Sequence, residues 1–462
     1  MKAHDGMYID GAWRPAASGE TIDVVNPADE QVIGHVPAGS AEDIDTAVRA
    51  ARAALPGWAA TPPAERAASL GALRDALVAR KDEIAETVTA ELGSPLAFSR
   101  AVHASVPIAV ADSYAELAAT HAFEEKVGNS VVHQEPIGVV GAITPWNYPL
   151  HQIVAKVAPA LAAGCTVVLK PAEDTPLTAQ LFAEAVDEAG IPAGVFNLVT
   201  GRGPVAGQAL AEHPGVDLVS FTGSTAVGRQ IGATAGAAIK KVALELGGKS
   251  ANVILPSADL AKAVNVGVAN VMSNSGQTCS AWTRMLVHHD QYDEAVRLAA
   301  TAAAKYGDRI GPVVNAKQYA RVRSYIEKGV AEGARLVAGG LERPSPQGYF
   351  IAPTVFADVT PDMTIAQEEI FGPVLSVLRY DDEDDAARIA NGTVYGLAGA
   401  VWAGEEAEAV AFARRLETGQ VDINGGRFNP RAPFGGYKQS GVGRELGAHG
   451  LSEYLQTKSL QF

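Results

Sequence analysis

Cysteine is scarce in this sequence, with two residues among 462, and no long apolar run makes up for it. Two thiols cannot build a disulfide framework, which excludes a small disulfide-stapled secreted domain. The longest apolar run, 157–169, is about 13 residues and contains Pro159, so it is too short to span a bilayer. Residues 1–6 also lack the apolar stretch of a secretory signal. We therefore predict a cytoplasmic protein without a membrane partner.

Basic residues are also in short supply, because 37 Lys and Arg face 52 Asp and Glu, for a net charge of −15. Nucleic acid demands a basic face, so we predict that it is not a partner. Hydrophobic residues make up 47% and charged residues 19% of the chain, which indicates a globular protein. Its length predicts two or three domains.

The two cysteines lie in opposite surroundings. Cys165 is flanked by apolar and small residues in 162–169, where a free thiol behaves as a small buried hydrophobe. Cys279 lies in 275–280, among hydroxyl and amide side chains and beside Gly276. Alone, that hexapeptide would still favour an unremarkable loop cysteine.

Two other side chains make Cys279 a candidate nucleophile. Glu245 ends an apolar strand and is followed by two glycines, and a carboxylate there is costly unless it is paired or serves as a base. Asn147 lies between Pro145 and Pro149 and can donate hydrogen bonds without carrying charge. A thiol, a carboxylate base and an amide donor are the groups that acyl chemistry needs.

The pattern of elements predicts an α/β fold. Short strands in 7–36 and helices at 40–55, 63–92 and 95–119 precede a regular alternation of strands and helices. We predict the following strands and helices in that alternation: strands 137–143, 166–169, 195–199, 217–221 and 241–244; helices 150–163, 176–189, 204–212 and 224–238. Such repeats form a Rossmann-type, doubly wound parallel sheet, which binds ligands at the carboxyl ends of its strands. Lys170, Gly223 and Glu245 all fall at that edge.

The second half predicts another α/β unit and no metal site. The expected elements are strands 252–255, 283–288, 335–337, 371–378 and 455–462, and helices starting at 259, 290–305, 316–332 and 386–390. The acidic run 381–385 precedes the last of these helices, where carboxylates complement the helix dipole. His288 and His289 lack the spacing of metal ligands.

Two glycine patterns compete for a phosphate-binding loop. The 201–207 segment is one residue too long for G-x-G-x-x-G and contains a proline, whereas 223–228 follows a strand and opens a helix. Lys170 and Glu173 could bond the hydroxyls of an adenosine ribose, and the Glu173 carboxylate would repel a phosphate there. We therefore predict NAD as cofactor, with NADP possible.

Seven motifs in order give the chain a resemblance to the NAD(P)-dependent aldehyde dehydrogenase superfamily over essentially its whole length. They are Pro145-Trp146-Asn147-Tyr148-Pro149, Leu169-Lys170-Pro171-Ala172-Glu173, Phe221-Thr222-Gly223-Ser224-Thr225, Leu244-Glu245-Leu246-Gly247-Gly248-Lys249, Gly276-Gln277-Thr278-Cys279, Glu368-Glu369-Ile370-Phe371-Gly372-Pro373 and Pro433-Phe434-Gly435-Gly436-Tyr437-Lys438. The resemblance implies a cofactor-binding domain (1–117 and 137–247), a catalytic domain (248–438) and a small oligomerisation element, a hairpin with the last strand (118–136 and 439–462).

The resemblance also implies roles for individual residues. Cys279 would be the nucleophile, Glu245 the base and Asn147 the oxyanion donor. The residues expected around the cofactor are Trp146, Lys170, Glu173, Gly203, Gly207, Phe221, Gly223, Ser224, Val227, Leu246, Gly247, Glu369 and Phe371. Those expected around the substrate are Tyr148, His151, Gln152, Ala155, Thr278, Ser280 and Phe428.

The implied activity is oxidation of a small-molecule aldehyde to its carboxylic acid by a homodimer or homotetramer. A CoA-acylating relative or, further away, a cysteine thiol hydrolase are the alternatives, and a carboxylate at Glu245 favours water over CoA as acyl acceptor. The chain departs from the family in 305–312, which is several residues shorter than usual. We expect this connection to lie away from the motifs.

Overall fold

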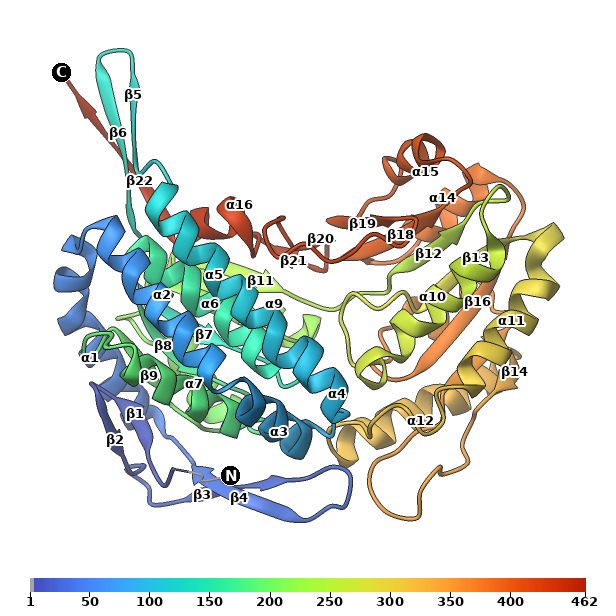
Figure 1. Ribbon diagram of the computed structural model, residues 1–462, viewed down its shortest axis with the longest axis horizontal. Helices are drawn as coiled ribbons and strands as arrows, with labels where there is room; N and C mark the ends of the chain where they lie inside the picture. The colour runs from blue at the N-terminus through green and yellow to red at the C-terminus, as the bar shows by residue number, and fades with distance from the viewer. Residues whose placement is uncertain (1–3) are drawn as a thin grey trace.

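The computed structural model describes residues 4–462, and two α/β lobes lie side by side in it (Figure 1). The first lobe is built on a six-stranded sheet in the order β21-β11-β10-β7-β8-β9. Its strands are β7 (Val139–Ile143), β8 (Thr166–Lys170), β9 (Phe196–Leu198), β10 (Leu218–Thr222), β11 (Lys241–Glu245) and β21 (Gly441–Val442). All pairings are parallel except that of β21 with β11, so the predicted doubly wound sheet is confirmed.

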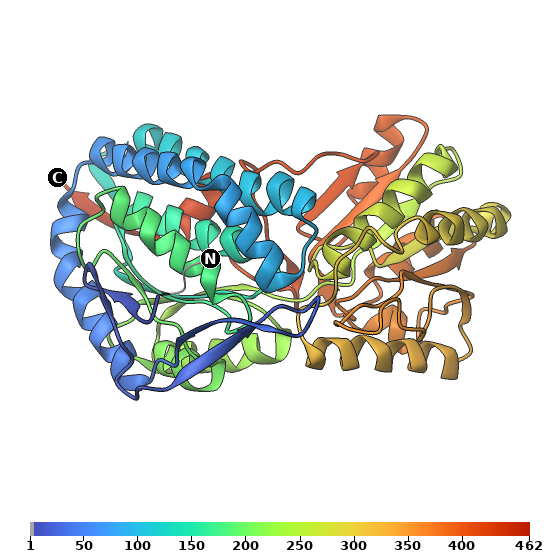
Figure 2. The same cartoon turned by 60° about the horizontal axis from the view of Figure 1, so that its bottom comes forward.

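Helices cover both faces of this sheet (Figure 2) because successive residues of each buried strand point to opposite sides. Val140 and Val167 pack with one group of helices, and their neighbours Val139 and Val168 pack with the other. The helices are α1 (Ala41–Ala60), α2 (Pro63–Ala79), α3 (Lys81–Leu92), α6 (Pro149–Ala163), α7 (Pro176–Glu188), α8 (Gln208–Glu212) and α9 (Thr225–Ala237), with a π-helix, η2 (Gly203–Gly207), before α8.

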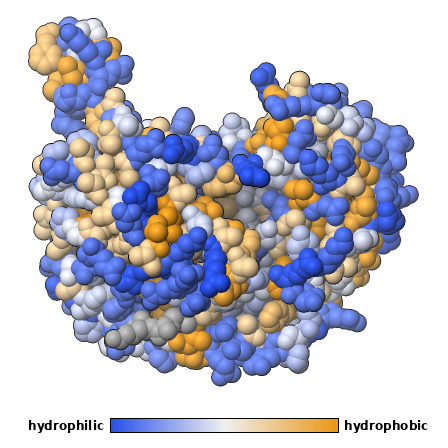
Figure 3. All heavy atoms as spheres, in the orientation of Figure 1, coloured by the Kyte–Doolittle hydropathy of each residue, from blue (hydrophilic) through white to orange (hydrophobic). Residues whose placement is uncertain are grey.

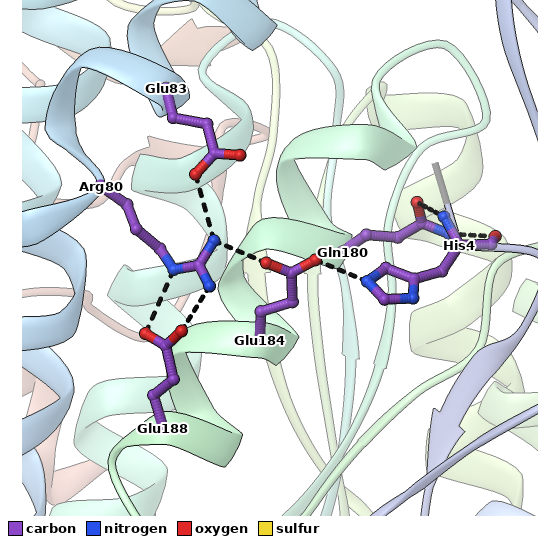
Figure 4. Close-up of polar contacts among 6 residues, drawn as sticks. All are labelled: His4, Arg80, Glu83, Gln180, Glu184 and Glu188. Atoms are coloured by element: carbon purple, nitrogen blue, oxygen red, sulfur yellow. Dashed lines mark hydrogen bonds and ion pairs between the residues drawn. The ribbon is translucent and has the colours of Figure 1, made fainter. Parts of the chain in front are cut away.

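The prediction of one helix over 63–92 is wrong, because the chain turns between α2 and α3 at Arg80. Figure 4 shows the reason: the Arg80 guanidinium bonds Glu83 on α3 and both Glu184 and Glu188 on α7. Glu184 also bonds His4. Tertiary ion pairs hold this turn, and helical periodicity does not reveal them.

The expected helix over 95–119 is also interrupted. It consists of α4 (Leu96–Phe98), a π-helix, η1 (Ser99–Ala104), and α5 (Ser105–Thr120). Pro107 has no N–H for the carbonyl of His103, and Ser105 Oγ donates 2.7 Å to the Arg100 carbonyl. The widened turn places His103 against the ring of Tyr148.

The second lobe has a seven-stranded sheet in the order β14-β15-β16-β13-β12-β18-β19. Its strands are β12 (Ala251–Ile254), β13 (Arg284–His288), β14 (Arg335–Ala338), β15 (Thr354–Ala357), β16 (Val374–Tyr380), β18 (Ala398–Trp402) and β19 (Gln420–Ile423). Its helices are α10 (Leu260–Met272), η3 (Ser273–Gly276), η4 (His289–Gln291), α11 (Tyr292–Ala304), α12 (Ala316–Ala331), α13 (Thr364–Gln367), α14 (Glu383–Asn391) and α15 (Glu406–Ala413). The sequence pattern missed β15, β18 and β19, and β16 begins three residues after the predicted start because Phe371 has a positive φ of 64°.

A narrow arm projects from the first lobe (Figure 1). It is an antiparallel sheet in the order β22-β6-β5, formed by β5 (Glu124–Val127), β6 (Ser130–Pro136) and the last strand β22 (Leu455–Gln461). The remaining elements are β1 (Met7–Ile9), β2 (Ala12–Arg14), β3 (Thr21–Val25), β4 (Val32–Pro37), β17 (Tyr395–Gly396), β20 (Tyr437–Lys438) and α16 (Gly447–Ser452). Among residues 4–462, no helix combines the length and apolar character needed to cross a membrane.

Candidate active site

Cys279 follows a short loop with unusual backbone geometry. After α10 ends at Met272, Asn274, Ser275 and Gly276 all have positive φ angles, of 49°, 56° and 74°. Such angles cost about 1–3 kcal/mol for each non-glycine residue and persist only where the surroundings hold them. A side chain on Gly276 would collide with the backbone of Gly372. The loop therefore presents Cys279 in one imposed conformation.

Hydrogen bonds from other segments hold this loop. Ser275 Oγ donates 2.7 Å to the Gly311 carbonyl, and Gln277 Oε1 accepts 2.9 Å from Val314 N–H. The expectation that the 305–312 connection lies away from the motifs is therefore wrong at its carboxyl end. Its Gly311 bonds directly to the loop that carries the thiol.

Asn147 contacts the same loop from the first lobe. The side-chain Nδ2 of Asn147 donates 3.0 Å to the backbone carbonyl of Gln277. The backbone carbonyl of Asn147 accepts 2.8 Å from Asn274 Nδ2. An amide nitrogen carries two N–H groups, and the bond to Gln277 uses one of them. Among residues 4–462 the other has no acceptor, so it can donate to a ligand. The side chain is 3% exposed, and Pro149 starts α6 two residues later.

The surroundings of the Cys279 thiol favour its protonated form. Burial raises its pKa, and the nearby carboxylates of Glu369 and Glu245 raise it further. The reaction must therefore remove the proton, because the thiolate is the nucleophilic form.

Glu245 ends β11 in a buried position, 5% exposed, and its Oε2 has no hydrogen-bond partner among residues 4–462. Burial raises its pKa well above the usual range, and the Glu445 carboxylate adds to this, while Lys156 opposes it. A carboxyl group of this kind can accept a proton near neutral pH.

The edge of the first sheet offers a site for a pyrophosphate. The N-cap of α9, Ser224, accepts a hydrogen bond of 3.4 Å from Val227 N–H, and the other first-turn N–H groups of α9 have no acceptor within the helix. Gly223 leaves no room for a side chain, because a Cβ there would overlap the ring of Phe221. Likewise, a Cβ on Gly228 would overlap Leu246. Close backbone approach and a positive helix end suit a phosphate.

Lys170 and Glu173 lie at the end of β8, where a ribose could bind. Lys170 is 2% exposed, its Nζ lies 3.4 Å from Glu173 Oε2, and burial lowers its pKa. Gly207 faces the Lys170 side chain, since a Cβ there would lie 3.7 Å from Lys170 Cδ. Gly203 starts the same π-helix, η2, with open space beside it.

A second cluster lies between the two lobes. Glu369 Oε1 accepts 3.0 Å from Gly248 N–H, and burial raises its pKa to about 7. A Cβ on Gly247 would come within 2.7 Å of Glu369 Oε2. Phe371 packs edge-to-face on Trp146, with ring centroids 5.4 Å apart. These carboxylate, aromatic and glycine surfaces, together with the α9 terminus, fit the ribose, ring and phosphate groups of a dinucleotide.

Four of the expected substrate residues contact one another in two pairs. Tyr148 Oη and Thr278 Oγ1 are 2.7 Å apart, and the His151 ring stands edge-to-face to Phe428 at 6.1 Å. His151 Nδ1 and Gln152 Oε1 are buried without a partner among residues 4–462, and burial lowers the pKa of His151 to about 4.

Ser280 follows the thiol directly and is half-buried. Ala155 has no exposed surface and packs within the core of the first lobe.

The model of the aldehyde dehydrogenase family matches residues 13–460. The chain belongs to the aldehyde dehydrogenase family. It is 48% identical to a 3-succinoylsemialdehyde-pyridine dehydrogenase from a Pseudomonas species, covering 100% of this chain and 99% of that protein.

Solved structures of the family agree closely with this fold. A cysteine-to-alanine variant of aldehyde dehydrogenase C from Pseudomonas syringae, bound to NAD⁺ and octanal, superposes with a TM-score of 0.98 at 47% identity, covering 99% of this chain and 96% of that one. An aldehyde dehydrogenase from Mycobacterium tuberculosis with NAD⁺ gives 0.97 at 45% identity, covering 99% and 98%. The predicted family and fold class are confirmed.

Sequence reasoning missed two charged residues of this aldehyde dehydrogenase that adjoin the base. Lys156 on α6 forms an ion pair with Glu445, and its Nζ also bonds Thr222 Oγ1 at 2.6 Å. Thr222 is paired with Glu245 across neighbouring strands. Lys156 lies within an apolar helix, α6, which indicates a buried position. Its partner Glu445 is 289 residues away in the sequence, so only the fold brings the two together.

The acidic run 381–385, the histidine pair 288–289 and the buried Arg284 lie outside this constellation. Asp382 caps α14 by accepting 2.9 Å from Asp385 N–H, as the helix-start interpretation predicts. The ligand atoms of His288, His289 and Asp290 lie within 4.8 Å of one another in a partly exposed turn, closer than their spacing suggested. Arg284 is buried against backbone carbonyls, including those of Ile389 and Ala390.

Proposed function

We propose that this aldehyde dehydrogenase oxidises aldehydes to carboxylic acids with NAD as the preferred cofactor. One observation supports the proposal most strongly. The thiol of Cys279, the amide of Asn147 and the buried carboxyl group of Glu245 lie beside a sheet edge that suits a dinucleotide. Each group suits one stage of the reaction.

In the first stage, Cys279 Sγ bonds to the carbonyl carbon of the aldehyde. The thiol proton leaves to the Glu245 carboxylate, whose raised pKa makes it an acceptor. The aldehyde oxygen becomes an oxyanion, held by the second N–H of the Asn147 amide and the backbone N–H of Cys279. Loss of one such donor typically slows a reaction by about 10²–10³-fold.

When bound, the nicotinamide ring supplies the acceptor for the hydride that the aldehyde carbon gives up. The residues that would hold the cofactor are Lys170 and Glu173 at a ribose, the α9 terminus at the phosphates, Glu369 at the second ribose, and Trp146 with Phe371 at the nicotinamide end. Glu173 would disfavour a ribose phosphate, so kcat/KM should be higher with NAD than with NADP.

In the last stage, water displaces the sulfur from the acyl group. The proton that Glu245 took from the thiol is first released to solvent. Glu245 then takes a proton from the attacking water, the acyl carbon gains the oxygen, and Cys279 Sγ leaves as the thiolate. Protonation of this thiolate by Glu245 restores the resting enzyme. A carboxylate in this place favours water over CoA as acceptor, and a thiol hydrolase would have no use for the Lys170–Glu173 edge.

The direct test is the absorbance of NADH in the near ultraviolet with a panel of aldehydes, repeated with NADP and with added CoA. We expect NAD reduction without CoA and release of the free acid. Reduction that depends on CoA, or acyl hydrolysis without NAD, would overturn the proposal.

For the substrate, we propose medium-sized aldehydes, aromatic ones included. The Pseudomonas relative is named for a pyridine-bearing semialdehyde and the P. syringae structure holds octanal. Arg431, the cation that could bind an acidic tail, lies 2.7 Å from Glu116 in an exposed ion pair.

Ala155→Trp tests the size of this substrate path. If the helix face with His151 and Ala155 borders the path, the indole should lower kcat/KM about tenfold more for benzaldehyde than for acetaldehyde. Equal losses in a variant with an unchanged melting temperature would exclude that helix face.

We also propose a homodimer or homotetramer assembled through the projecting arm. Val127, Leu460 and Phe462 on it are 52%, 41% and 83% exposed, and hydrophobic atoms are visible on the arm in Figure 3. Its outer strands can also pair with another sheet. Light scattering after gel filtration tests this proposal, and a monomer at micromolar concentration would refute it. A cytoplasmic location stays a prediction, which cell fractionation can check.

A further inference from the structure

A cavity of about 330 Å³ opens beside the catalytic loop, on the side of the second lobe. Ser280, the neighbour of Cys279, forms part of its wall. The other walls come from α10, from Ser273 at the start of η3, from Trp282 before β13, from β19 and from the segment that follows β19. The lining residues are Val266, Ala269, Asn270, Ser273, Ser280, Trp282, Gln420, Asp422, Gly425, Gly426 and Phe428.

Asp422 is the one charged side chain among these lining residues. Gln420 Nε2 donates 3.1 Å to Asp422 Oδ1, and within residues 4–462 no lysine, arginine or histidine forms an ion pair with this carboxylate. Burial raises its pKa. The carboxylate thus faces the cavity with partial desolvation and without a cation to balance its charge.

Two other polar side chains of the lining form hydrogen bonds within the protein. Asn270 Oδ1 accepts 2.9 Å from Trp282 N–H, and Ser273 Oγ donates 2.8 Å to the Ala269 carbonyl. Two aromatic side chains complete the lining, Trp282 at 4% exposure and Phe428 at 45%. A carboxylate with aromatic neighbours and no basic side chain attracts a cation, through charge and through the negative faces of the rings.

We propose that this Asp422 pocket binds a cationic amine at the far end of the substrate, so that the enzyme favours aldehydes carrying a protonated nitrogen. The inference rests on the proposed function, because it needs an aldehyde at Cys279. The aldehyde carbon lies at the thiol, and the tail passes Ser280 into the pocket. The ammonium group then donates to the free acceptor sites of Asp422.

The proposal can be tested with two aldehydes of matched shape. In para-(dimethylaminomethyl)benzaldehyde the amine is protonated at neutral pH, and para-isobutylbenzaldehyde replaces its nitrogen with carbon. The measured quantity is the ratio of their kcat/KM values, because this ratio cancels effects common to both substrates. In the native enzyme we expect the cationic aldehyde to be favoured, and the preference to appear mainly in KM, since the tail is bound equally before and during the reaction.

Asp422→Asn removes the charge while keeping the shape. We expect the ratio to fall about tenfold, as a hydrogen bond to a charged group would produce. The acidic para-carboxybenzaldehyde should gain relative to the neutral compound in the same variant. Asp308→Asn, at an exposed position outside the pocket, is the matched control and should keep the native ratio.

The outcomes separate this inference from the proposed function. If neither matched aldehyde reduces NAD, the proposed function fails. If the neutral aldehyde is oxidised but the ratio is the same in the native enzyme and in Asp422→Asn, the Asp422 pocket does not bind the cation. An equal fall of the ratio in Asp308→Asn would attribute the preference to net charge, and would also overturn the inference.

Discussion

The two cysteines differ in the exposure of the residue and, more strongly, in the polar groups that surround each sulfur. Cys165 has no exposed surface, and its Sγ donates 3.3 Å to the Tyr454 carbonyl within the core of the first lobe. Cys279 is partly exposed and follows three residues with positive φ. Burial raises the pKa of both thiols, that of Cys165 to about 12. A lowered pKa therefore does not mark the reactive thiol in this protein.

Neighbouring groups mark it instead. Around Cys279 lie an amide donor and a buried carboxyl group, whereas Cys165 is packed among apolar side chains and donates to one backbone carbonyl. The backbone of Asn274 and Ser275 adopts unfavourable positive φ angles, which position the loop that carries the thiol. Hydrogen bonds from Asn274 and Ser275 to distant segments stabilise these angles.

The largest expected effect separates the two cysteines directly. Cys279→Ala should lower kcat by about 10⁴-fold or more, because it removes the nucleophile. Cys165→Ala should leave kcat within about twofold and cost about 1 kcal/mol of stability through a small cavity. Steady-state NADH formation and urea unfolding measure both. Similar losses of activity in two folded variants would contradict the assignment.

Glu245→Gln should be the next most severe change. The neutral amide cannot take a proton from water, so steady-state turnover should fall about 10²–10⁴-fold. If deacylation is the stage most affected, mixing in a stopped-flow instrument should give a burst of NADH before the slow phase. An unchanged steady-state rate would mean that another group activates the water.

Two glycines near the cysteines allow a matched test of loop geometry. Gly276→Ala would push the loop away from Gly372, and a displacement near 1 Å can cost about 10²-fold in rate. Gly164→Ala, at φ 94° just before Cys165, should cost only about 1 kcal/mol of stability. Comparable kcat values for the two variants would show that the loop geometry does not matter to the chemistry.

Both cysteines should make the free energy of unfolding fall at alkaline pH. A buried thiol whose pKa is raised keeps its proton when folded but loses it when unfolded, so its stabilising contribution is complete below pH 9 and declines between pH 9 and 12. By pH 10 the loss of stability that results from the raised pKa of Cys165 is about 1.4 kcal/mol.

Cys165→Ala should therefore lose less stability than the native protein between pH 8 and 10 in urea unfolding. Cys279→Ala should behave similarly, since its thiol pKa is also raised. A pH dependence identical to that of the native protein in both variants would argue against buried neutral thiols.

Most of the fold could be predicted from local pattern. The strands of the first sheet are short, apolar and separated by helices of the right length, and parallel packing follows because both faces are buried. The errors lie where tertiary contacts override periodicity, at the Arg80 turn and at the π-helix before α5. In the second lobe, β15, β18 and β19 lack such regular spacing, so they were missed.

The sequence by itself determined which residues could carry the chemistry, because strand ends place Lys170 and Glu245 at one edge of a sheet and a glycine-containing loop carries Cys279. Only the tertiary structure decided their state. Contact between distant segments set the loop strain, the raised pKa values, the Lys156–Glu445 pair, the bond from Gly311 and the unpaired charge of Asp422. The physical reason is that pKa values and backbone strain depend on desolvation and on neighbours in space. The spacing of residues along the chain determines neither desolvation nor those neighbours.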